Sequence, residues 1–239
     1  MNKMRACIMI PAYNEEGAII SVIRSIKKLK LRGSIIVIDD GSIDSTAQQA
    51  KRENVKILAL PFNLGIGGAV QTGLKYALRY NYDVAVQCDA DGEHDASSIP
   101  SLIKALDDNT DVVIGSRFID GRRYTGSYSR LIGIGVFSFL IRLATKRYIR
   151  DATSGFRVWN KRAVRFLVNN YPTEFPEPES IVYLLQNNFR IKEIPVTMKR
   201  RMYGRSSVTF WRALYYMVSI SIAIILASLR HKSYYGKRL

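Results

Sequence analysis

Cysteine is scarce in this sequence: only Cys7 and Cys88 occur among 239 residues, each inside an apolar stretch. We expect both to be reduced thiols of the core, because two isolated cysteines favour neither a disulfide framework nor a cysteine-based metal site. The chain also lacks an internal repeat, a low-complexity tract and a recognisable linker. Its apolar fraction of 47% excludes a disordered polymer, and its length suits one large core or two small domains.

The first residues lack the apolar run of a signal peptide. The N-terminal apolar stretch spans five residues and ends at Pro11, whereas the hydrophobic region of a signal peptide has roughly 7–15. We therefore expect the chain to start in the cytosol.

Acidic residues are rare in the second half of the chain. Residues 117–239 contain 23 Lys and Arg against 6 Asp and Glu, a balance of +17, whereas residues 1–116 contain 13 against 14. All of the excess positive charge therefore lies in the second half. Such a one-sided distribution indicates an anionic partner, with nucleic acid, a phosphorylated lipid and a membrane surface as the candidates.

Apolar stretches and helical patterns alternate from the first residues to residue 116. The strand-like stretches are mostly continuous, as expected for strands buried on both faces, and lie at Arg5–Pro11, Ser34–Asp39, Val55–Leu60, Asp83–Cys88 and Asp111–Ser116. Helical periodicity lies between them, at Glu15–Leu29, Ser42–Glu53, Ile66–Tyr80 and Ser97–Leu106. This alternation predicts an α/β fold with a Rossmann-like, mostly parallel sheet and helices on both faces. Ligands of such sheets bind at the carboxyl ends of the strands.

The second half is expected to add two very apolar helices. Leu131–Thr145 is too short to span a bilayer and better suited to lying on one. Ala213–Leu229 has 17 residues without a charge, at the lower limit of the ~17–25 that a span needs. A buried core helix is the alternative, but we favour membrane contact because a basic tail follows. Other elements are expected at Lys161–Asn169, in a helix up to Gln186, and in a strand at Ile191–Thr197.

Polar residues follow the first two predicted strands. In PAYNEEG, after the first strand, Asn14 is expected to cap the helix that Glu15 and Glu16 begin. The second strand ends in Asp39 and Asp40. A carboxylate at this position can accept a hydrogen bond from a nucleobase N–H or a ribose hydroxyl.

Glycines at positions 65, 67 and 68 open the helix after the third strand. They predict a phosphate or ribose cradle at that helix start. The dinucleotide fingerprint would need a glycine where Val70 stands, and it would follow the first strand. A dehydrogenase is therefore disfavoured, while close approach of the backbone to a ligand is still expected.

Asp89 and Asp91 follow the fourth strand, in VAVQCDADGEH. Because alternate residues of an extended chain share a face, their carboxylates would repel each other unless a cation or a proton lay between them. Mg²⁺ or Mn²⁺ commonly takes one or two carboxylates, with phosphate oxygens completing the shell. We prefer this metal site to an acid pair for proton transfer or a solvated loop. Asp95 is expected to cap the next helix, and His94 is not expected to be a ligand.

Six motifs in order carry a family resemblance. P-A-Y-N-E, V-I-D-D-G-S, G-I-G-G-A and D-A-D lie within residues 8–116, and D-A-T-S-G-F-R (residues 151–157) and R-M-Y-G-R-S-S (residues 201–207) follow. Together they resemble the family-2 glycosyltransferases of the GT-A fold, in the branch of the dolichyl-phosphate mannose synthases. The resemblance implies transfer of a hexose from a nucleotide sugar, of the GDP-mannose or UDP-glucose type, to a polyprenyl phosphate with inversion.

The resemblance also implies roles for individual residues. The nucleotide sugar would be bound by Pro11, Tyr13, Glu15, Asp39, Gly67, Asp89, Ala90 and Asp91. The metal would be held by Asp89 and Asp91, with Glu93 added as a third ligand at a position where the family often has glutamine. The phosphate of acceptor or donor would be bound by Arg117, Arg130, Arg201 and Ser206, and the catalytic residues would be Asp89, Asp91 and Arg117.

The chemistry of a phosphate acceptor agrees with the charge distribution. A polyprenyl phosphate is already an oxyanion and needs no general base, but positive charge must offset its repulsion from the donor diphosphate. The metal would stabilise the leaving diphosphate as a Lewis acid. Asp151 would be a general base for a hydroxyl acceptor, whereas with a phosphate acceptor we expect it to fix Arg157 or a backbone turn.

Three rival functions remain open. A peripheral glycosyltransferase acting on a saccharide or protein hydroxyl would need an acceptor-side base and no apolar helices. A nucleic-acid-binding module would not need Asp89 and Asp91, so we expect no nucleic acid partner. A non-catalytic donor-binding subunit is disfavoured by the intact D-A-D.

We expect one GT-A glycosyltransferase domain in residues 1–210, with a donor half in residues 1–116 and an acceptor half in residues 117–210. An apolar helix and a basic tail follow in residues 211–239. We expect the protein at the cytoplasmic face of a membrane, peripheral or anchored by that helix, with homo-oligomerisation left open.

Overall fold

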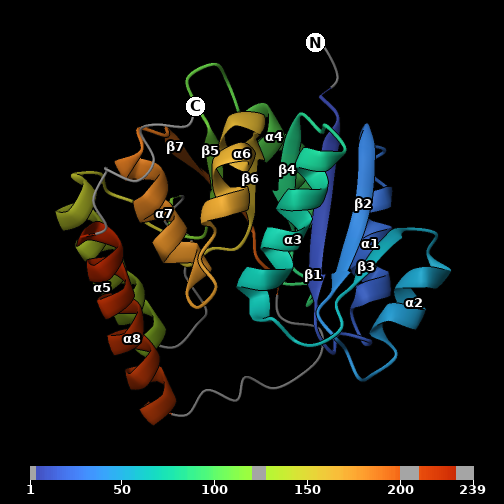
Figure 1. Ribbon diagram of the computed structural model, residues 1–239, viewed down its shortest axis with the longest axis horizontal. Coiled ribbons are helices and arrows are strands. Elements are labelled where there is room, and N and C mark those ends of the chain that lie inside the picture. The colour runs from blue at the N-terminus through green and yellow to red at the C-terminus, as the bar shows by residue number, and fades with distance from the viewer. Residues whose placement is uncertain (1–3, 120–127, 200–209, 230–239) are drawn as a thin grey trace.

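The computed structural model describes residues 4–119, 128–199 and 210–229. They contain a seven-stranded sheet with the order β3-β2-β1-β4-β6-β5-β7 (Figure 1). The strands are β1 (Ala6–Ala12), β2 (Gly33–Asp39), β3 (Lys56–Ala59), β4 (Val84–Gln87), β5 (Val112–Ser116), β6 (Arg157–Asn160) and β7 (Ile191–Pro195). The α-helices are α1 (Ile19–Lys27), α2 (Thr46–Arg52), α3 (Gly65–Arg79), α4 (Ile99–Lys104), α5 (Tyr128–Thr145), α6 (Lys161–Asn170), α7 (Pro176–Gln186) and α8 (Phe210–Leu229).

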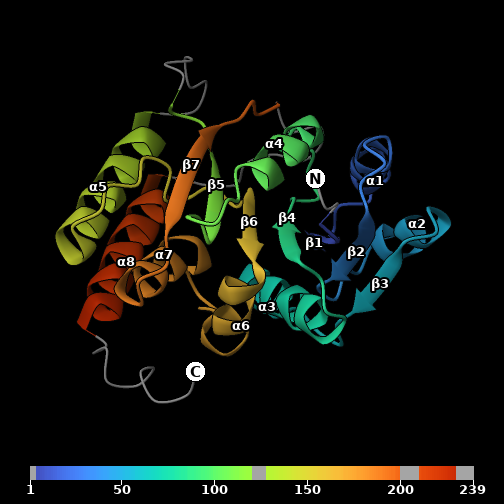
Figure 2. The ribbon, with the colours of Figure 1, turned by 90° about the horizontal axis from the view of Figure 1, so that it is seen from above.

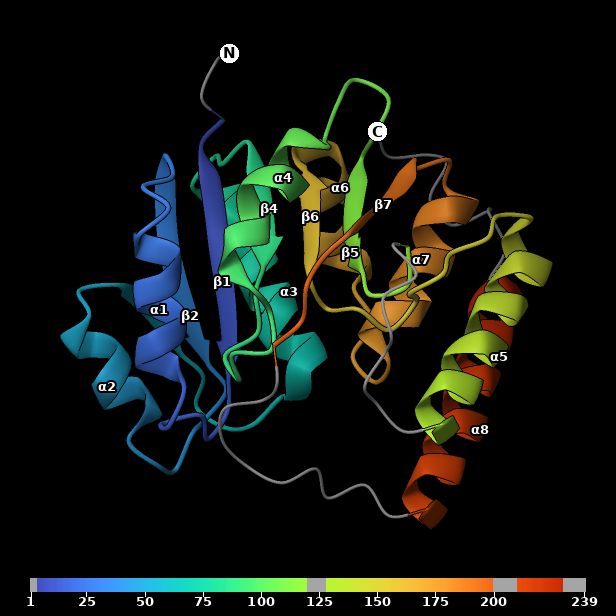
Figure 3. The same cartoon turned by 180° about the vertical axis from the view of Figure 1, so that it is seen from behind.

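Helices cover both faces of the sheet, and each face has its own apolar core. Along β1, Cys7 and Met9 point into the core shared with α3, α6 and α7, whereas Ile8 and Ile10 point into the core shared with α1, α2 and α4. The view from above shows α3 and α6 on one side of the sheet and α1 and α4 on the other (Figure 2), and the view from behind shows α1 and α4 in front (Figure 3). The predicted mostly parallel α/β sheet is therefore confirmed.

β6 is a strand that the sequence analysis did not predict. It pairs antiparallel with both β4 and β5 and thus separates them in the sheet. Its first residue is Arg157, whose side chain is fully buried. Apolar periodicity is the signal by which strands are found in a sequence, so a four-residue strand that begins with a buried arginine escapes it.

Helices α1 and α2 begin later than predicted. α1 starts at Ile19, with Ala18 at its N-cap, instead of at Glu15. Asn14 has a φ of 54°, and its Oδ1 accepts the N–H of Ile43 at 3.0 Å. The prediction that Asn14 caps α1 is therefore wrong, because its side chain binds the turn after β2 instead.

The apolar helices α5 and α8 lie side by side at the β7 end of the sheet (Figure 2). Phe137 of α5 and Ile224 of α8 belong to the core that also contains α3 and α7. At the end of α7, Nε2 of Gln186 donates to the carbonyl oxygen of Ser228 at 2.9 Å. Among the helices of the described ranges, none is long and apolar enough to cross a membrane.

Candidate active site

The turns that follow β1 and β2 are hydrogen-bonded to each other. The N–H of Asn14 donates to Oγ of Ser42 at 3.0 Å, and the N–H of Glu15 donates to Oγ1 of Thr46 at 2.8 Å. Backbone groups of one turn are thus satisfied by hydroxyls of the other, which fixes both turns at the carboxyl end of the parallel strands. In this fold class that end of the sheet is where ligands bind.

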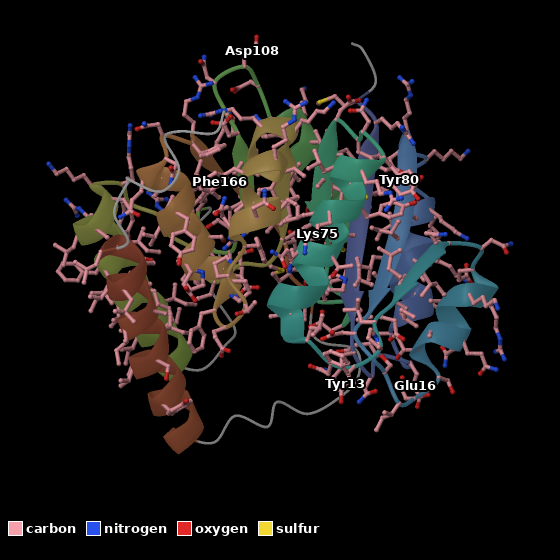
Figure 4. All side chains as sticks on the ribbon, viewed as in Figure 1. Tyr13, Glu16, Lys75, Tyr80, Asp108 and Phe166 are labelled. Atoms are coloured by element: carbon pink, nitrogen blue, oxygen red, sulfur yellow. The ribbon has the colours of Figure 1, made fainter. Side chains whose placement is uncertain are left out.

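A cavity of about 350 Å³ lies at this end of the sheet, between the ends of β1, β2 and β4 and the start of α3. Figure 4 shows Tyr13 at this end, away from Tyr80 and Asp108. The cavity is lined by Pro11, Ala12, Tyr13, Glu15, Asp40, Asn63, Gly65, Ile66, Ala69, Asp89, Ala90 and Asp91. Site residues predicted from two separate motifs, P-A-Y-N-E and D-A-D, are thus brought together. Asp40 and Gly65 line the cavity in place of Asp39 and Gly67, to which the sequence analysis assigned nucleotide-sugar binding.

Asp39 and Asp40 are both buried but differ in their surroundings. Oδ1 of Asp39 accepts the N–H of Ser42 at 3.3 Å, so this carboxylate holds its own turn. Asp40 lines the cavity, and its Oδ1 accepts the N–H of Leu64 at 2.8 Å. Burial raises the pKa of Asp40 against the opposing effect of the N–H donors of Leu64 and Gly65. Base reading by Asp39 stays a prediction, and Asp40 becomes a second candidate for a polar contact with the nucleoside.

Gly65 and Gly67 at the start of α3 have different environments. A Cβ on Gly67 would come within 2.5 Å of the carbonyl oxygens of Pro172 and Thr173, so this glycine permits the helix to approach that loop. Gly65 has a φ of +77° and open space at its Cβ position, and it lines the cavity. A ligand-facing role is therefore better supported for Gly65 than for Gly67, whose place in the nucleotide site stays a prediction.

Asp89 and Asp91 both line the cavity directly after β4. Oδ1 of Asp89 accepts Nε2 of Gln87 at 3.0 Å, and Oδ1 of Asp91 accepts the N–H of Glu93 at 2.9 Å. The side chain of Asp89 is 32% exposed. Both carboxylates are therefore oriented by neighbouring residues while remaining at the cavity wall.

The donor set suits a divalent cation that arrives with its phosphate ligands. In the described ranges, no three His, Cys, Asp or Glu side chains come together as a metal cluster, so the three-carboxylate set that included Glu93 is not present as a preformed site. Mg²⁺ and Mn²⁺ are commonly held by one or two carboxylates plus substrate phosphates. The pair Asp89 and Asp91 fits that pattern, and a role for Glu93 stays a prediction.

The loop after Asp91 folds back onto the strand end. Gly92, with a φ of +79°, reverses the chain so that Nδ1 of His94 accepts the N–H of Asp89 at 3.0 Å. Asp95 accepts the N–H of Ser97 as the N-cap of the following 3₁₀ turn, which confirms its predicted capping role. The sequence analysis set His94 aside as a ligand, and its contact with Asp89 depends on a turn that residue periodicity does not reveal.

Arg117 follows β5 and is bound to Asp151. Its Nε lies 2.7 Å from Oδ2 and its Nη2 lies 2.6 Å from Oδ1 of that carboxylate, and Nη2 also donates to Oγ1 of Thr153 at 2.8 Å. The N–H of Asp151 donates in turn to Oε1 of Glu193 at 2.9 Å. The carboxylate of Asp151 also accepts the backbone N–H of Arg117 at 3.0 Å. Asp151 therefore positions the side chain and the backbone of Arg117, whereas the sequence analysis expected it to fix Arg157 or a backbone turn.

Arg157 is a buried cation beneath the site. It donates to the carbonyl oxygens of Ala152, Ser154 and Glu177 and to Oγ of Ser180. Burial lowers its pKa, while the charges of nearby carboxylates oppose that shift. Arg157 thereby ties the 152–154 turn and the first turn of α7 to the strand next to β4. The sequence analysis missed this function because the motif shows an arginine but not its burial.

Three predicted phosphate-binding residues remain to be placed. Arg201 and Ser206 lie outside the described residues, as does the side chain of Arg130, whose backbone belongs to the first turn of α5. Their predicted roles therefore stay predictions.

Comparisons with known proteins agree on one family. The model of the family described as glycosyl transferase family 2 matches residues 7–167. The chain is 30% identical over 210 residues to UDP-N-acetylglucosamine–dolichyl-phosphate N-acetylglucosaminyltransferase of Methanococcus voltae, a match that covers 79% of this chain and 83% of that protein. It is 26% identical over 234 residues to polyprenol monophosphomannose synthase of Mycolicibacterium smegmatis, covering 86% of this chain and 81% of that one.

Solved structures support the same fold. Glucosyl-3-phosphoglycerate synthase from Mycobacterium tuberculosis, crystallised with Mn²⁺, UDP and phosphoglyceric acid, superposes with a TM-score of 0.73. The match covers 94% of this chain and 78% of that one at 20% sequence identity. It shows that the sheet and its covering helices form the GT-A arrangement.

Proposed function

The chain belongs to glycosyl transferase family 2 and is a glycosyltransferase, and on that premise we propose that it transfers a hexose from a nucleotide sugar to a polyprenyl phosphate. The observation that carries the proposal is the cavity that joins the turns after β1 and β2 to the Asp89–Asp91 pair. Its carboxylates suit a nucleoside diphosphate that binds together with a divalent cation, and relatives named for dolichyl and polyprenyl phosphates point to the acceptor.

The donor nucleoside would occupy the part of the cavity between the two interlocked turns. Pro11 and Tyr13 would contact the base and ribose, and Asp40 or Asp39 would accept a hydrogen bond from the base. Relatives named for N-acetylglucosamine and for mannose both match the chain. A test of the donor must therefore include UDP-sugars and GDP-sugars.

The donor diphosphate would extend from this region to Asp89 and Asp91, which we propose to hold Mg²⁺ or Mn²⁺ with the phosphate oxygens. When bound, the cation supplies Lewis-acid stabilisation of the leaving nucleoside diphosphate. The two carboxylates would fix the diphosphate in place, and Ala90 between them also lines the cavity.

The acceptor phosphate would need positive charge but no general base. A phosphate oxyanion can attack the anomeric carbon directly as the bond to the nucleoside diphosphate breaks, which inverts that centre. Asp151 is fully buried and paired with Arg117, which disfavours it as the base that a hydroxyl acceptor would need. This pairing supports the phosphate acceptor over the hydroxyl acceptor, and we propose Arg117 as a cation that meets the acceptor phosphate.

Membrane contact is proposed through α5 and α8. Each helix exposes a row of large apolar side chains with helical spacing, namely Ile132, Val136, Phe139 and Leu143 on α5 and Tyr215, Val218, Ile222, Ile225, Leu226 and Leu229 on α8. Exposed basic residues accompany the α5 row: Arg142 lies directly before its last member, and Lys146, Arg147 and Arg150 follow it. An apolar row beside basic residues is typical of a helix that lies in an anionic lipid interface, where a polyprenyl phosphate would be found.

The proposal is tested with membranes that carry the protein. They are incubated with radiolabelled UDP-glucose, UDP-N-acetylglucosamine or GDP-mannose and a polyprenyl phosphate, with and without EDTA. We expect one donor to give lipid-soluble label that EDTA abolishes and excess Mn²⁺ restores. An Asp91→Asn variant should lose this activity, whereas Asp108→Asn, an exposed aspartate at the opposite end of the sheet (Figure 4), should retain it. Absence of lipid-soluble label with every donor would sink the proposal.

A further inference from the structure

Three residues from separate segments surround the carboxylate of Asp89. Gln87 donates its Nε2 to Oδ1 of Asp89 at 3.0 Å, and Nε2 of His94 lies 3.6 Å from Oδ2. On a third side, a Cβ placed on Gly155 would lie 3.0 Å from Oδ2. The carboxylate is therefore bounded by protein on the sides away from the cavity.

His94 is itself held in one orientation. Its ring stacks on Phe156, with centroids 4.6 Å apart and planes inclined by 10°, and the residue is 8% exposed. Its Nδ1 accepts the N–H of Asp89 at 3.0 Å, so the proton of the neutral ring lies on Nε2, facing Asp89. The same ring thus fixes the backbone of Asp89 and places an N–H donor beside its carboxylate.

Gly155 leaves the space that the carboxylate of Asp89 occupies. A Cβ at this position would lie 2.9 Å from Nε2 of Gln87 and 3.0 Å from Oδ2 of Asp89, closer than ordinary van der Waals contact. Both crowded atoms are the ends of side chains, so an added methyl group would be accommodated by moving the carboxylate and the amide. An alanine here should therefore alter the direction of the carboxylate while the fold survives.

We propose that His94 and Gly155 are positioning residues for metal-dependent donor binding, acting through Asp89. This inference rests on the proposed function. The proposed role differs from simple packing because both residues affect the same carboxylate. His94 holds the backbone N–H of Asp89, and Gly155, in the D-A-T-S-G-F-R motif, leaves space beside Oδ2 of Asp89. Residues that orient a metal ligand in this way typically change metal affinity by about 10–100-fold when they are replaced.

The test measures binding of Mn²⁺ instead of turnover. The free Mn²⁺ signal is followed by electron paramagnetic resonance as purified full-length protein is titrated with Mn²⁺ in the presence of UDP or GDP. His94→Leu removes the acceptor for the N–H of Asp89, whereas His94→Asn keeps an oxygen close to the position of Nδ1. Gly155→Ala crowds the carboxylate, and Gly73→Ala on α3 is its matched control, because a Cβ at Gly73 would lie 2.7 Å from Met9 and 3.2 Å from Ile38, both apolar side chains.

We expect His94→Leu and Gly155→Ala to weaken Mn²⁺ binding about 10–100-fold, with His94→Asn intermediate and Gly73→Ala unchanged. Nucleotide binding without metal should change little in all four variants, and thermal unfolding identifies any variant that has not folded. If the wild-type protein fails to bind Mn²⁺ both in the presence of UDP and in the presence of GDP, the metal step of the proposed function is wrong. If the wild type binds and folded His94→Leu and Gly155→Ala bind equally well, the inference alone is overturned.

Discussion

Arg117 is held by Asp151 through two nitrogens, with Nε 2.7 Å from Oδ2 and Nη2 2.6 Å from Oδ1. The side chain of Arg117 is 9% exposed and that of Asp151 is fully buried. A buried bidentate pair has a fixed geometry, because each partner compensates the charge and the hydrogen bonds of the other. This pair sets the direction of the guanidinium that would meet an incoming phosphate.

Breaking this pair should be costly. Removing one partner of a buried ion pair typically destabilises a protein by about 3–5 kcal/mol, because the other charge is left buried and uncompensated. We therefore expect Asp151→Ala to lower the free energy of unfolding by about that amount, measured by urea denaturation. In the double variant Asp151→Ala with Arg117→Met, the loss of unfolding free energy should be smaller than the sum of the losses in the two single variants. The exposed pair Lys192–Asp107, 3.4 Å apart, is the control, and Lys192→Ala should have a much smaller effect. If the losses of unfolding free energy from the substitutions at Arg117 and Asp151 were additive, the two residues would not act as a coupled pair.

The two glycines at the start of α3 should respond differently to alanine. At Gly67 the new Cβ would meet backbone oxygens of residues 172 and 173 at 2.5 Å, which cannot move without shifting the loop. We expect Gly67→Ala to cost about 1–3 kcal/mol of stability, with a smaller effect on donor affinity. Gly65→Ala places a methyl group at the cavity wall with a φ of +77°, so it should weaken donor binding more than Gly67→Ala does. Calorimetric titration with the donor nucleotide measures the affinity of each variant, and thermal unfolding measures its stability. If Gly67→Ala weakened donor binding more than Gly65→Ala, the phosphate or ribose cradle would be assigned to Gly67.

The buried carboxylate Asp111 should make stability depend on pH. Burial alone would raise its pKa, but hydrogen bonds from the N–H of Arg190 and from the side chains of Asn160 and Arg162 outweigh that effect and hold the pKa below its ordinary value. Because the folded pKa is lowered, the stabilisation is present above the unfolded pKa of about 3.9 and is lost as the pH falls through the folded value.

Asp111→Asn should therefore be less stable than the wild type at pH 7, and the difference should shrink as the pH falls below about 4. Urea denaturation at pH 7, 5 and 3.5 measures this difference. Asp107→Asn is the matched control on the exposed neighbouring turn, where the same substitution should change stability less. A difference between Asp111→Asn and the wild type that stayed constant with pH would contradict the assignment.

The parts of the fold that follow from local pattern were predictable. The continuous apolar runs of β1, β2, β4 and β5 are the direct consequence of burial on both faces, and the alternation with helices predicts the parallel sheet. β6 pairs antiparallel with β4 and β5 and could not be predicted. Its first residue, Arg157, is buried only because carbonyl groups of the 152–154 turn and of α7 accept its hydrogen bonds.

The site shows the same division. Asp89 and Asp91 could be predicted because two carboxylates one residue apart directly follow an apolar strand, a pattern that is visible in the sequence. Which of Gly65 and Gly67 faces the ligand could not be predicted, because Gly67 packs against a loop about 105 residues further along the chain. The role of His94 could not be predicted either, because its ring reaches Asp89 through the turn at Gly92 and is held by Phe156.

The exposed apolar rows of α5 and α8 should determine lipid binding. Phe139 is 58% exposed and Ile222 is 51% exposed, so a charged residue at either position would disturb little of the core. We expect Phe139→Asp with Ile222→Asp to reduce binding to vesicles of mixed neutral and anionic lipid in a flotation assay, because apolar burial and attraction of the basic residues both contribute. Ile43→Asp, at an 88% exposed position beside the donor turns, is the matched control and should still bind. Activity with a short-chain, water-soluble polyprenyl phosphate should persist in the double variant, because the donor cavity lies on other elements. If the double variant still bound vesicles as the wild type does, membrane contact would have to be assigned to another surface.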